Sequence, residues 1–268
     1  MSRLSTRLTE LAGSGRKALV GFITAGDPDA GATVPALHAL VAGGADVLEL
    51  GVPFSDPEAE GPAIQRSSER ALANGIGLAD CLEMVRQFRA HDPDTPVVLM
   101  GYLNSIIAMG EEVFAQRASA AGADGVIMVN LPPEEAGALS SALLEVDMDL
   151  VFLIAPTTTA ERTSKIVAQG RGFLYYVTLK GITGADHLDV ASVGERVAGI
   201  RRQANVPVLA GFGIKDASSA KALAAHADGV VVGSALVNTM AEISDPDLRV
   251  AALTRQMAEL RAGVDSAS

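Results

Sequence analysis

The feature that most constrains the fold is a unit that repeats along the chain: a short apolar run, turn residues, then an alanine- and leucine-rich stretch with helical spacing. The runs are almost continuously apolar, which is typical of parallel strands buried on both faces. Eight runs occur, at 18–24, 47–51, 97–100, 125–129, 150–154, 173–178, 206–210 and 229–232. Helical patterns lie between them, for example at 32–42, 111–121, 134–144, 190–203 and 217–225, and the acids that we expect at helix starts are Asp29, Asp80, Glu134 and Asp216.

Eight β-α units in 268 residues predict an α/β protein with a single (β/α)8 TIM barrel. A doubly wound sheet of about six strands would leave two of the runs without a place. The longest interval separates the second and third runs, and it predicts extra helix and a long loop at 52–62. Because no linker or change of composition divides the chain, we expect one domain over residues 1–268.

Composition excludes several classes of protein. The 21 basic and 32 acidic residues give a net charge of -11 without a basic stripe, so we expect no nucleic-acid partner. Cys81 is the one cysteine, and the four histidines are scattered, so neither a disulfide nor a metal site is expected. The first residues are polar and no apolar run approaches membrane length, so we expect a cytoplasmic protein with no membrane contact.

Glu49 is the first candidate for chemistry because it lies inside the otherwise apolar run 47–51. Active groups of a TIM barrel project from the carboxyl ends of its strands, and burial raises a carboxyl pKa towards the range that acid-base catalysis needs. The alternative is a rim glutamate paired with a base. The loop that follows carries Asp56, Glu58 and Glu60, which fits either a lid that delivers a second carboxylate or a solvated acidic turn.

Two glycine-rich turns follow the last two predicted strands. Gly211 and Gly213 flank Phe212, and Gly233 precedes Ser234 at an expected helix start. Glycines let a phosphate approach backbone N–H groups, and TIM barrels often bind phosphate after strands seven and eight. These turns therefore indicate a phosphate site, with ordinary turn geometry as the alternative, and the glycine-flanked loop 181–184 could close over it.

Several segments resemble signature segments of the tryptophan synthase alpha chain family: 21–28 (GFITAGDP), 48–57 (LELGVPFSDP), 61–65 (GPAIQ), 181–184 (GITG) and 211–213 (GFG). The resemblance runs in register across nearly the whole chain. It implies a lyase that cleaves indole-3-glycerol phosphate to indole and glyceraldehyde 3-phosphate without a cofactor of its own. It also implies an alpha2beta2 complex with a pyridoxal-phosphate beta chain that receives the indole.

Carried over position by position, the resemblance implies that Glu49 is the general acid-base and Glu60 the second catalytic acid. It implies an indole pocket formed by Phe22, Ile64, Met100, Ile127 and Phe212, with Tyr175 beside Glu49 and Thr183 in a closing loop. It implies a phosphate cradle at Gly184, Gly213, Gly233 and Ser234. We expect the beta chain to contact the loops 53–62 and 179–189.

Four residues depart from the family pattern near the site: Glu60 replaces an aspartate, Glu58 a small or apolar residue, Asn130 an aspartate and Leu179 a basic residue. The sequence therefore leaves two functions open within the family. One is an active lyase, and the other is a catalytically impaired homologue that mainly binds and activates a beta chain. A sugar-phosphate epimerase or isomerase is disfavoured, because the first strand has no aspartate and no strand ends in histidine.

Overall fold

The strands close into a parallel barrel in chain order. The computed structural model describes residues 2–177, 190–211 and 213–267. The strands are β1 (Ala18–Thr24), β2 (Val47–Gly51), β3 (Val97–Gly101), β4 (Gly125–Met128), β5 (Asp149–Ile154), β6 (Leu174–Val177), β7 (Val208–Gly211) and β8 (Gly229–Val232), and β8 pairs with β1. The predicted TIM barrel is confirmed. β7 begins two residues later than predicted, because Pro207 has no N–H to donate to a neighbouring strand.

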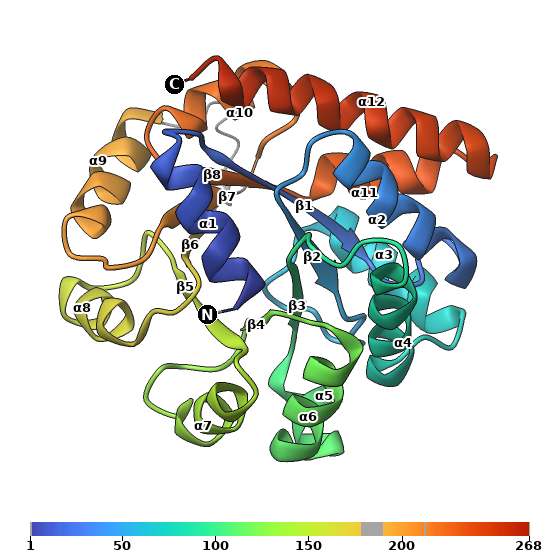
Figure 1. Ribbon diagram of the computed structural model, residues 1–268, viewed down its shortest axis with the longest axis horizontal. Coiled ribbons are helices and arrows are strands. Elements are labelled where there is room, and N and C mark those ends of the chain that lie inside the picture. The colour runs from blue at the N-terminus through green and yellow to red at the C-terminus, as the bar shows by residue number, and fades with distance from the viewer. Residues whose placement is uncertain (1, 178–189, 212, 268) are drawn as a thin grey trace.

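Helices surround the strands (Figure 1). They are α1 (Arg3–Gly13), α2 (Thr33–Ala42), α3 (Pro62–Ala73), α4 (Leu78–Arg89), α5 (Leu103–Met109), α6 (Glu111–Ala121), α7 (Gly137–Glu145), α8 (Ala160–Gln169), α9 (Val190–Arg201), α10 (Ala217–Ala224), α11 (Ser234–Glu242) and α12 (Pro246–Asp265), with a 3-10 turn η1 (Ala30–Ala32). Both α3 and α4 lie between β2 and β3, which confirms the extra helix predicted there. Among the residues that the structure describes, no helix is long and apolar enough to cross a membrane.

Of the acids expected at helix starts, two accept a backbone N–H there and two do not. Asp216 caps α10 by accepting the backbone N–H of Ser219, and Asp80 in the first turn of α4 accepts the N–H of Gly77. Asp29 precedes η1 but makes no capping hydrogen bond from its side chain. The prediction for Glu134 is wrong, because the chain first makes a turn through Pro132 and Pro133 and α7 begins only at Gly137.

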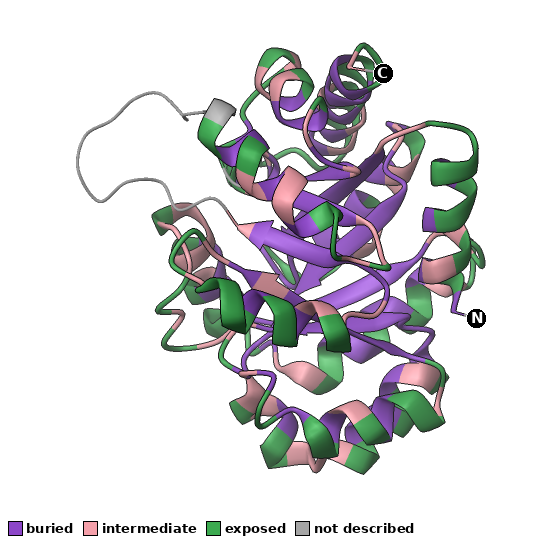
Figure 2. Cartoon of the chain, turned by 90° about the vertical axis from the view of Figure 1, so that its left-hand side faces the viewer, coloured by how far each residue is buried: buried purple, intermediate pink, exposed green. Residues whose placement is uncertain are grey.

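Apolar side chains fill both sides of the barrel wall, and the buried residues lie in the strands and on the inner faces of the helices (Figure 2). An outer core packs the strands against the surrounding helices, and it includes Cys81. A second cluster fills the barrel interior with Val20, Val47, Val98, Ile127, Val151, Phe173, Leu209 and Val231. Leu4, Leu8 and Leu11 of α1 join this cluster, so α1 closes the amino-terminal end of the barrel.

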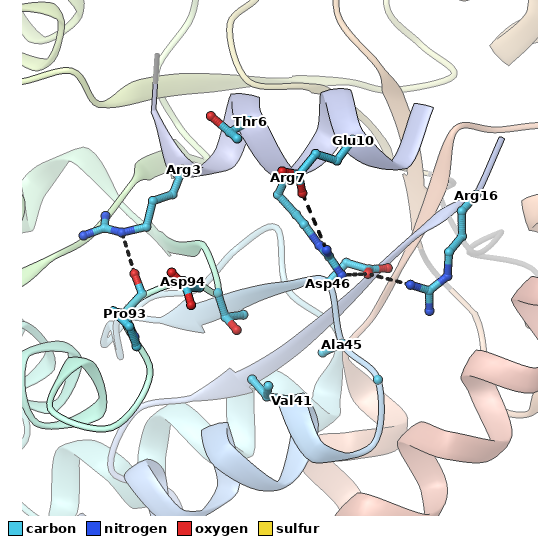
Figure 3. Close-up of a pocket in the computed structure, with 12 residues that line it drawn as sticks. Arg3, Thr6, Arg7, Glu10, Arg16, Val41, Ala45, Asp46, Pro93 and Asp94 are labelled. Carbon is cyan, nitrogen blue, oxygen red and sulfur yellow. Dashed lines mark hydrogen bonds and ion pairs between the residues drawn. The ribbon is translucent and has the colours of Figure 1, made fainter. Parts of the chain in front are cut away.

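Buried aspartates at the amino ends of the strands hold α1 in place. Asp46, just before β2, accepts the backbone N–H of Leu19 at 2.9 Å and a hydrogen bond from Arg7 of α1 at 2.7 Å. Figure 3 shows Asp46 between the side chains of Arg7 and Arg16. Arg261 of α12 donates to the other oxygen of Asp46 at 2.8 Å. This carboxylate therefore joins β1, α1 and α12.

We expect Asp46→Asn to lower the free energy of unfolding by about 3 kcal/mol, because it leaves buried donors facing an amide. Urea denaturation of the two proteins measures the difference. Asp265→Asn is the matched control, since Asp265 is exposed and pairs with the same Arg261, and exposed pairs contribute about 0–1 kcal/mol. Equal effects of the two substitutions would contradict the assignment of Asp46 as the joining residue.

Candidate active site

Glu49 faces the barrel interior near the carboxyl end of β2. Side chains two apart along a strand point to the same face, and Val47 belongs to the interior cluster. Glu49 is 1% exposed, and its Oε2 has no hydrogen-bond partner among the residues described. Burial, together with the charge of Glu60, raises the pKa of Glu49 to about 8. Glu49 is therefore a carboxyl that mostly keeps its proton at neutral pH.

Glu60 comes to the same place from the loop between β2 and α3. Its backbone N–H donates to Pro57 at 3.1 Å, and its carbonyl accepts from the side chain of Gln65 at 2.9 Å. Burial raises the pKa of Glu60 to about 7. The structure thus brings together the two carboxyl groups that the sequence singled out, each with a pKa close to neutral pH.

Two aromatic rings flank the carboxyls, and each lies against a glycine. A Cβ at Gly51 would stand 2.7 Å from Cζ of Phe22, and a Cβ at Gly211 would stand 2.5 Å from Oη of Tyr175. The pKa of Tyr175 is raised well above 10 by burial and then by Glu49 and Glu60. Tyr175 therefore lies beside Glu49 as a neutral phenol.

A narrow pocket opens between Phe22 and the loop that carries Glu60, and neither Glu49 nor Tyr175 is among its lining residues. It is lined by Phe22, Thr24, Gly51, Val52, Phe54, Pro57, Glu60, Ile64, Ser68, Met100, Gly101 and Tyr102. Phe22, Ile64 and Met100 are predicted pocket residues that line it. Ile127 is the register partner of Met100 on β4 and is fully buried in the interior cluster, so it lies beneath the pocket wall.

The glycine turns lie on the same carboxyl-terminal end of the barrel, after β7 and β8. Gly213 has φ +74°, a backbone conformation that favours glycine. Gly233 is the N-cap of α11, and the exposed Ser234 is its first residue. The first N–H groups of a helix have no partner within it, so the start of α11 presents donors and a partial positive charge. A Cβ at Gly233 would stand 3.4 Å from Phe22, which places this turn next to the pocket.

Other predicted residues fall elsewhere. Thr183, Gly184, Phe212 and Leu179 lie outside the described residues. Asn130 accepts the backbone N–H of Leu103 at 2.8 Å and donates to Asn104, so its side chain serves the start of α5.

Tyr102 and Phe54 were missed by the sequence reasoning. Tyr102 is 7% exposed and follows β3 directly, and its ring stacks on Phe54 with centroids 4.7 Å apart and planes 15° apart. The position of Tyr102 immediately after a predicted strand was a signal for it, since side chains at that end of a barrel strand face the site. Phe54 gave no such signal, because only the folded loop shows its contact.

Comparison with known proteins identifies the family. A family model described as tryptophan synthase alpha chain matches residues 8–265. The tryptophan synthase alpha chain of Chromobacterium violaceum is 55% identical over 264 residues, covering 98% of this chain and 100% of the relative. That of Xanthomonas axonopodis pv. citri is 57% identical over 246 residues, covering 91% and 92%. The crystal structure of tryptophan synthase subunit alpha from Legionella pneumophila superposes with a TM-score of 0.92 at 44% identity, with 99% of each chain covered.

The chain belongs to the tryptophan synthase alpha chain family.

Membership of this family confirms the family resemblance that the sequence motifs indicated and disfavours the sugar-phosphate epimerase or isomerase. Within residues 2–177, 190–211 and 213–267, no group of three or more histidine, cysteine, aspartate or glutamate side chains is placed to hold a metal ion.

Proposed function

We propose that this chain, a lyase by its family, cleaves indole-3-glycerol phosphate to indole and glyceraldehyde 3-phosphate, with Glu49 as general acid-base. The observation that carries the proposal is the buried carboxyl of Glu49 near the carboxyl end of β2, with a pKa of about 8 and an Oε2 that has no partner among the described residues. Protonated Glu49 gives its proton to the ring carbon that bears the glycerol chain. The carbon-carbon bond then breaks and leaves its electron pair on the ring, while the adjacent hydroxyl gives its proton to the Glu49 carboxylate and becomes the aldehyde, which restores the protonated Glu49.

Glu60 has a different part in this proposal. The ring carries positive charge after it is protonated, and the indole N–H becomes more acidic. A carboxylate at Glu60 that accepts this N–H stabilises the charged ring as the bond breaks. The raised pKa of about 7 leaves a substantial ionised fraction of Glu60 at neutral pH. In this proposal Phe22, Ile64 and Met100 line the indole pocket, Ile127 supports it from below, and Tyr175 supports Glu49. The roles that the resemblance implies for Phe212 and Thr183 fall outside the described residues.

Indole release from indole-3-glycerol phosphate by the purified chain tests the proposal, measured alone and with a tryptophan synthase beta chain. We expect indole in both assays and a higher rate with the beta chain. The impaired homologue is not favoured, because relatives named tryptophan synthase alpha chain match this chain at more than half of the aligned positions over nearly its full length. Absence of indole in both assays would overturn the lyase proposal.

We propose that the substrate phosphate binds at Gly184, Gly213, Gly233 and Ser234. Backbone N–H groups at the start of α11 would supply hydrogen bonds and a favourable dipole, so no lysine is needed. We expect Ser234→Asp to raise the KM for indole-3-glycerol phosphate about tenfold or more, because it places a like charge against a dianion. Ser141→Asp, at an exposed position within α7, is the control. An unchanged KM in Ser234→Asp would contradict a phosphate site at the start of α11.

We propose a tryptophan synthase beta chain as partner, in an alpha2beta2 complex, with contacts through the loops 53–62 and 179–189. In this proposal the chain needs no cofactor of its own, and pyridoxal phosphate is bound by the beta chain that takes up the indole. The proposed location of the complex is the cytoplasm. Gel filtration with the cognate beta chain at tens of micromolar tests the partnership, since a moderate affinity gives a complex at that concentration. Separate elution of the two chains would contradict it.

A further inference from the structure

Tyr102 connects β3 to the loop that carries Glu60. Among the residues described, the hydrogen bond and the ring contact that tie residues 53–59 to another element both end on Tyr102. The backbone N–H of Ala59 donates to Oη of Tyr102 at 3.2 Å, and the ring of Phe54 stacks on the Tyr102 ring. Ala59 directly precedes Glu60, so the Tyr102 hydroxyl fixes the backbone next to that carboxyl.

Tyr102 is itself held firmly enough to act as an anchor. It is 7% exposed and joins the end of β3 to the start of α5. Its neighbour Gly101 lies close to the start of the same loop, where a Cβ would stand 3.2 Å from Val52, and Val52 donates its N–H to the carbonyl of Met100 at 2.7 Å. The start of the loop, at Val52, and its later part, at Ala59, are thus both held against the end of β3.

We infer that Tyr102 is a positioning residue for the lyase reaction: through Ala59 and Phe54 it sets the place of the Glu60 carboxyl against Glu49 and the substrate ring. The inference rests on the proposed function, and it deepens that function by adding a pocket-lining residue that acts on the reaction through the position of Glu60.

Tyr102 should also affect the ionisation of Glu49. Among the residues that the structure describes, the titratable groups that face Glu49 are Glu60 from the loop and Tyr175 from β6. Its register partners on the neighbouring strands, Phe22 and Val98, carry no charge. If Ala59 is released, Glu60 withdraws and water enters, and both changes lower the pKa of Glu49.

The test compares Tyr102→Phe, which keeps the ring contact and loses the hydroxyl, with Phe54→Leu, which loses the ring contact and keeps the hydroxyl. Tyr176→Phe is the matched control, since Tyr176 lies on β6 in the outer core. We expect Tyr102→Phe to lower kcat about tenfold, because a displacement of about 1 Å can cost about 10²-fold and the ring contact retains part of the position. KM should change less, and the alkaline limb of the pH profile should move to lower pH. Phe54→Leu should show the same changes.

A second readout does not depend on turnover. The pKa of Glu49 is measured by NMR of protein labelled with ¹³C-carboxyl glutamate, with the Glu49 signal assigned from Glu49→Gln. It should fall in Tyr102→Phe and stay unchanged in Tyr176→Phe. An unchanged pKa of Glu49 in Tyr102→Phe overturns the inference, as does a parental kcat and pH profile. If the parent forms no indole, the lyase proposal fails and the NMR titration alone decides the role of Tyr102.

Discussion

Glu49→Gln should lower the rate of indole formation by about 10²–10⁴-fold, the usual worth of general acid-base catalysis. Glutamine has nearly the same shape as glutamate but cannot give or take the proton. The fold should be retained, because Glu49 makes no ion pair and its Oε2 has no partner among the described residues. Steady-state indole production gives the rate, and the urea midpoint shows that the variant is folded. A folded Glu49→Gln variant with a nearly parental rate would contradict the assignment of Glu49 as the general acid-base.

The pKa of about 8 gives this prediction a second check. The rate should fall above about pH 8, where Glu49 loses the proton that it must donate. The folded protein holds that proton between pH 4.5, the ordinary pKa, and about 8, whereas the unfolded chain has released it. The contribution of Glu49 to the free energy of unfolding is therefore complete below pH 4.5 and is lost as the pH rises through about 8. Glu49→Gln should remove that part of the pH dependence.

The barrel could be predicted from the sequence because its signal is local. Each buried parallel strand is a short apolar run, and the eight runs leave one architecture of the right length. Glu49 was found in the same way, as a charged residue within such a run. Its inward direction also follows from local alternation, since Val47 two residues before it fills the interior.

The rest of the site depends on contacts between distant segments. The aspartates that precede strands, such as Asp46, gave no sign that they bind arginines of α1 and α12. The loop after β2 could be read equally well as a solvated acidic turn, because its contacts with Tyr102 and Gln65 exist only in the folded chain. The prediction that a helix starts near Glu134 was wrong for a local reason, because the turn through two prolines delays the start of α7 to Gly137.

Glu60→Gln should lower indole formation by about 10²-fold, because it removes the charge that accepts the indole N–H. The pKa of Glu49 should fall as well, since the charge of Glu60 is the second cause of its elevation after burial. The alkaline limb of the pH profile should then move to lower pH. Glu58→Gln is the matched control, because Glu58 lies on the same loop and is exposed. Similar losses in the two variants would mean that loop charge in general, and not the Glu60 carboxyl, supports turnover.

Glu60→Asp separates an ordinary active chain from an impaired one. Aspartate shortens the side chain by one methylene, about 1.5 Å along the stem. In this chain the loop is held at Ala59 by Tyr102, and Glu60 is already close enough to Glu49 to raise its pKa. A shorter acid on the same backbone withdraws from Glu49 and from the indole N–H, so we expect the rate to fall about tenfold, within the range for displacements of about 1 Å. A rate above that of the parent would show instead that the longer acid is badly seated. The impaired homologue would then be the better description, despite its close relatives.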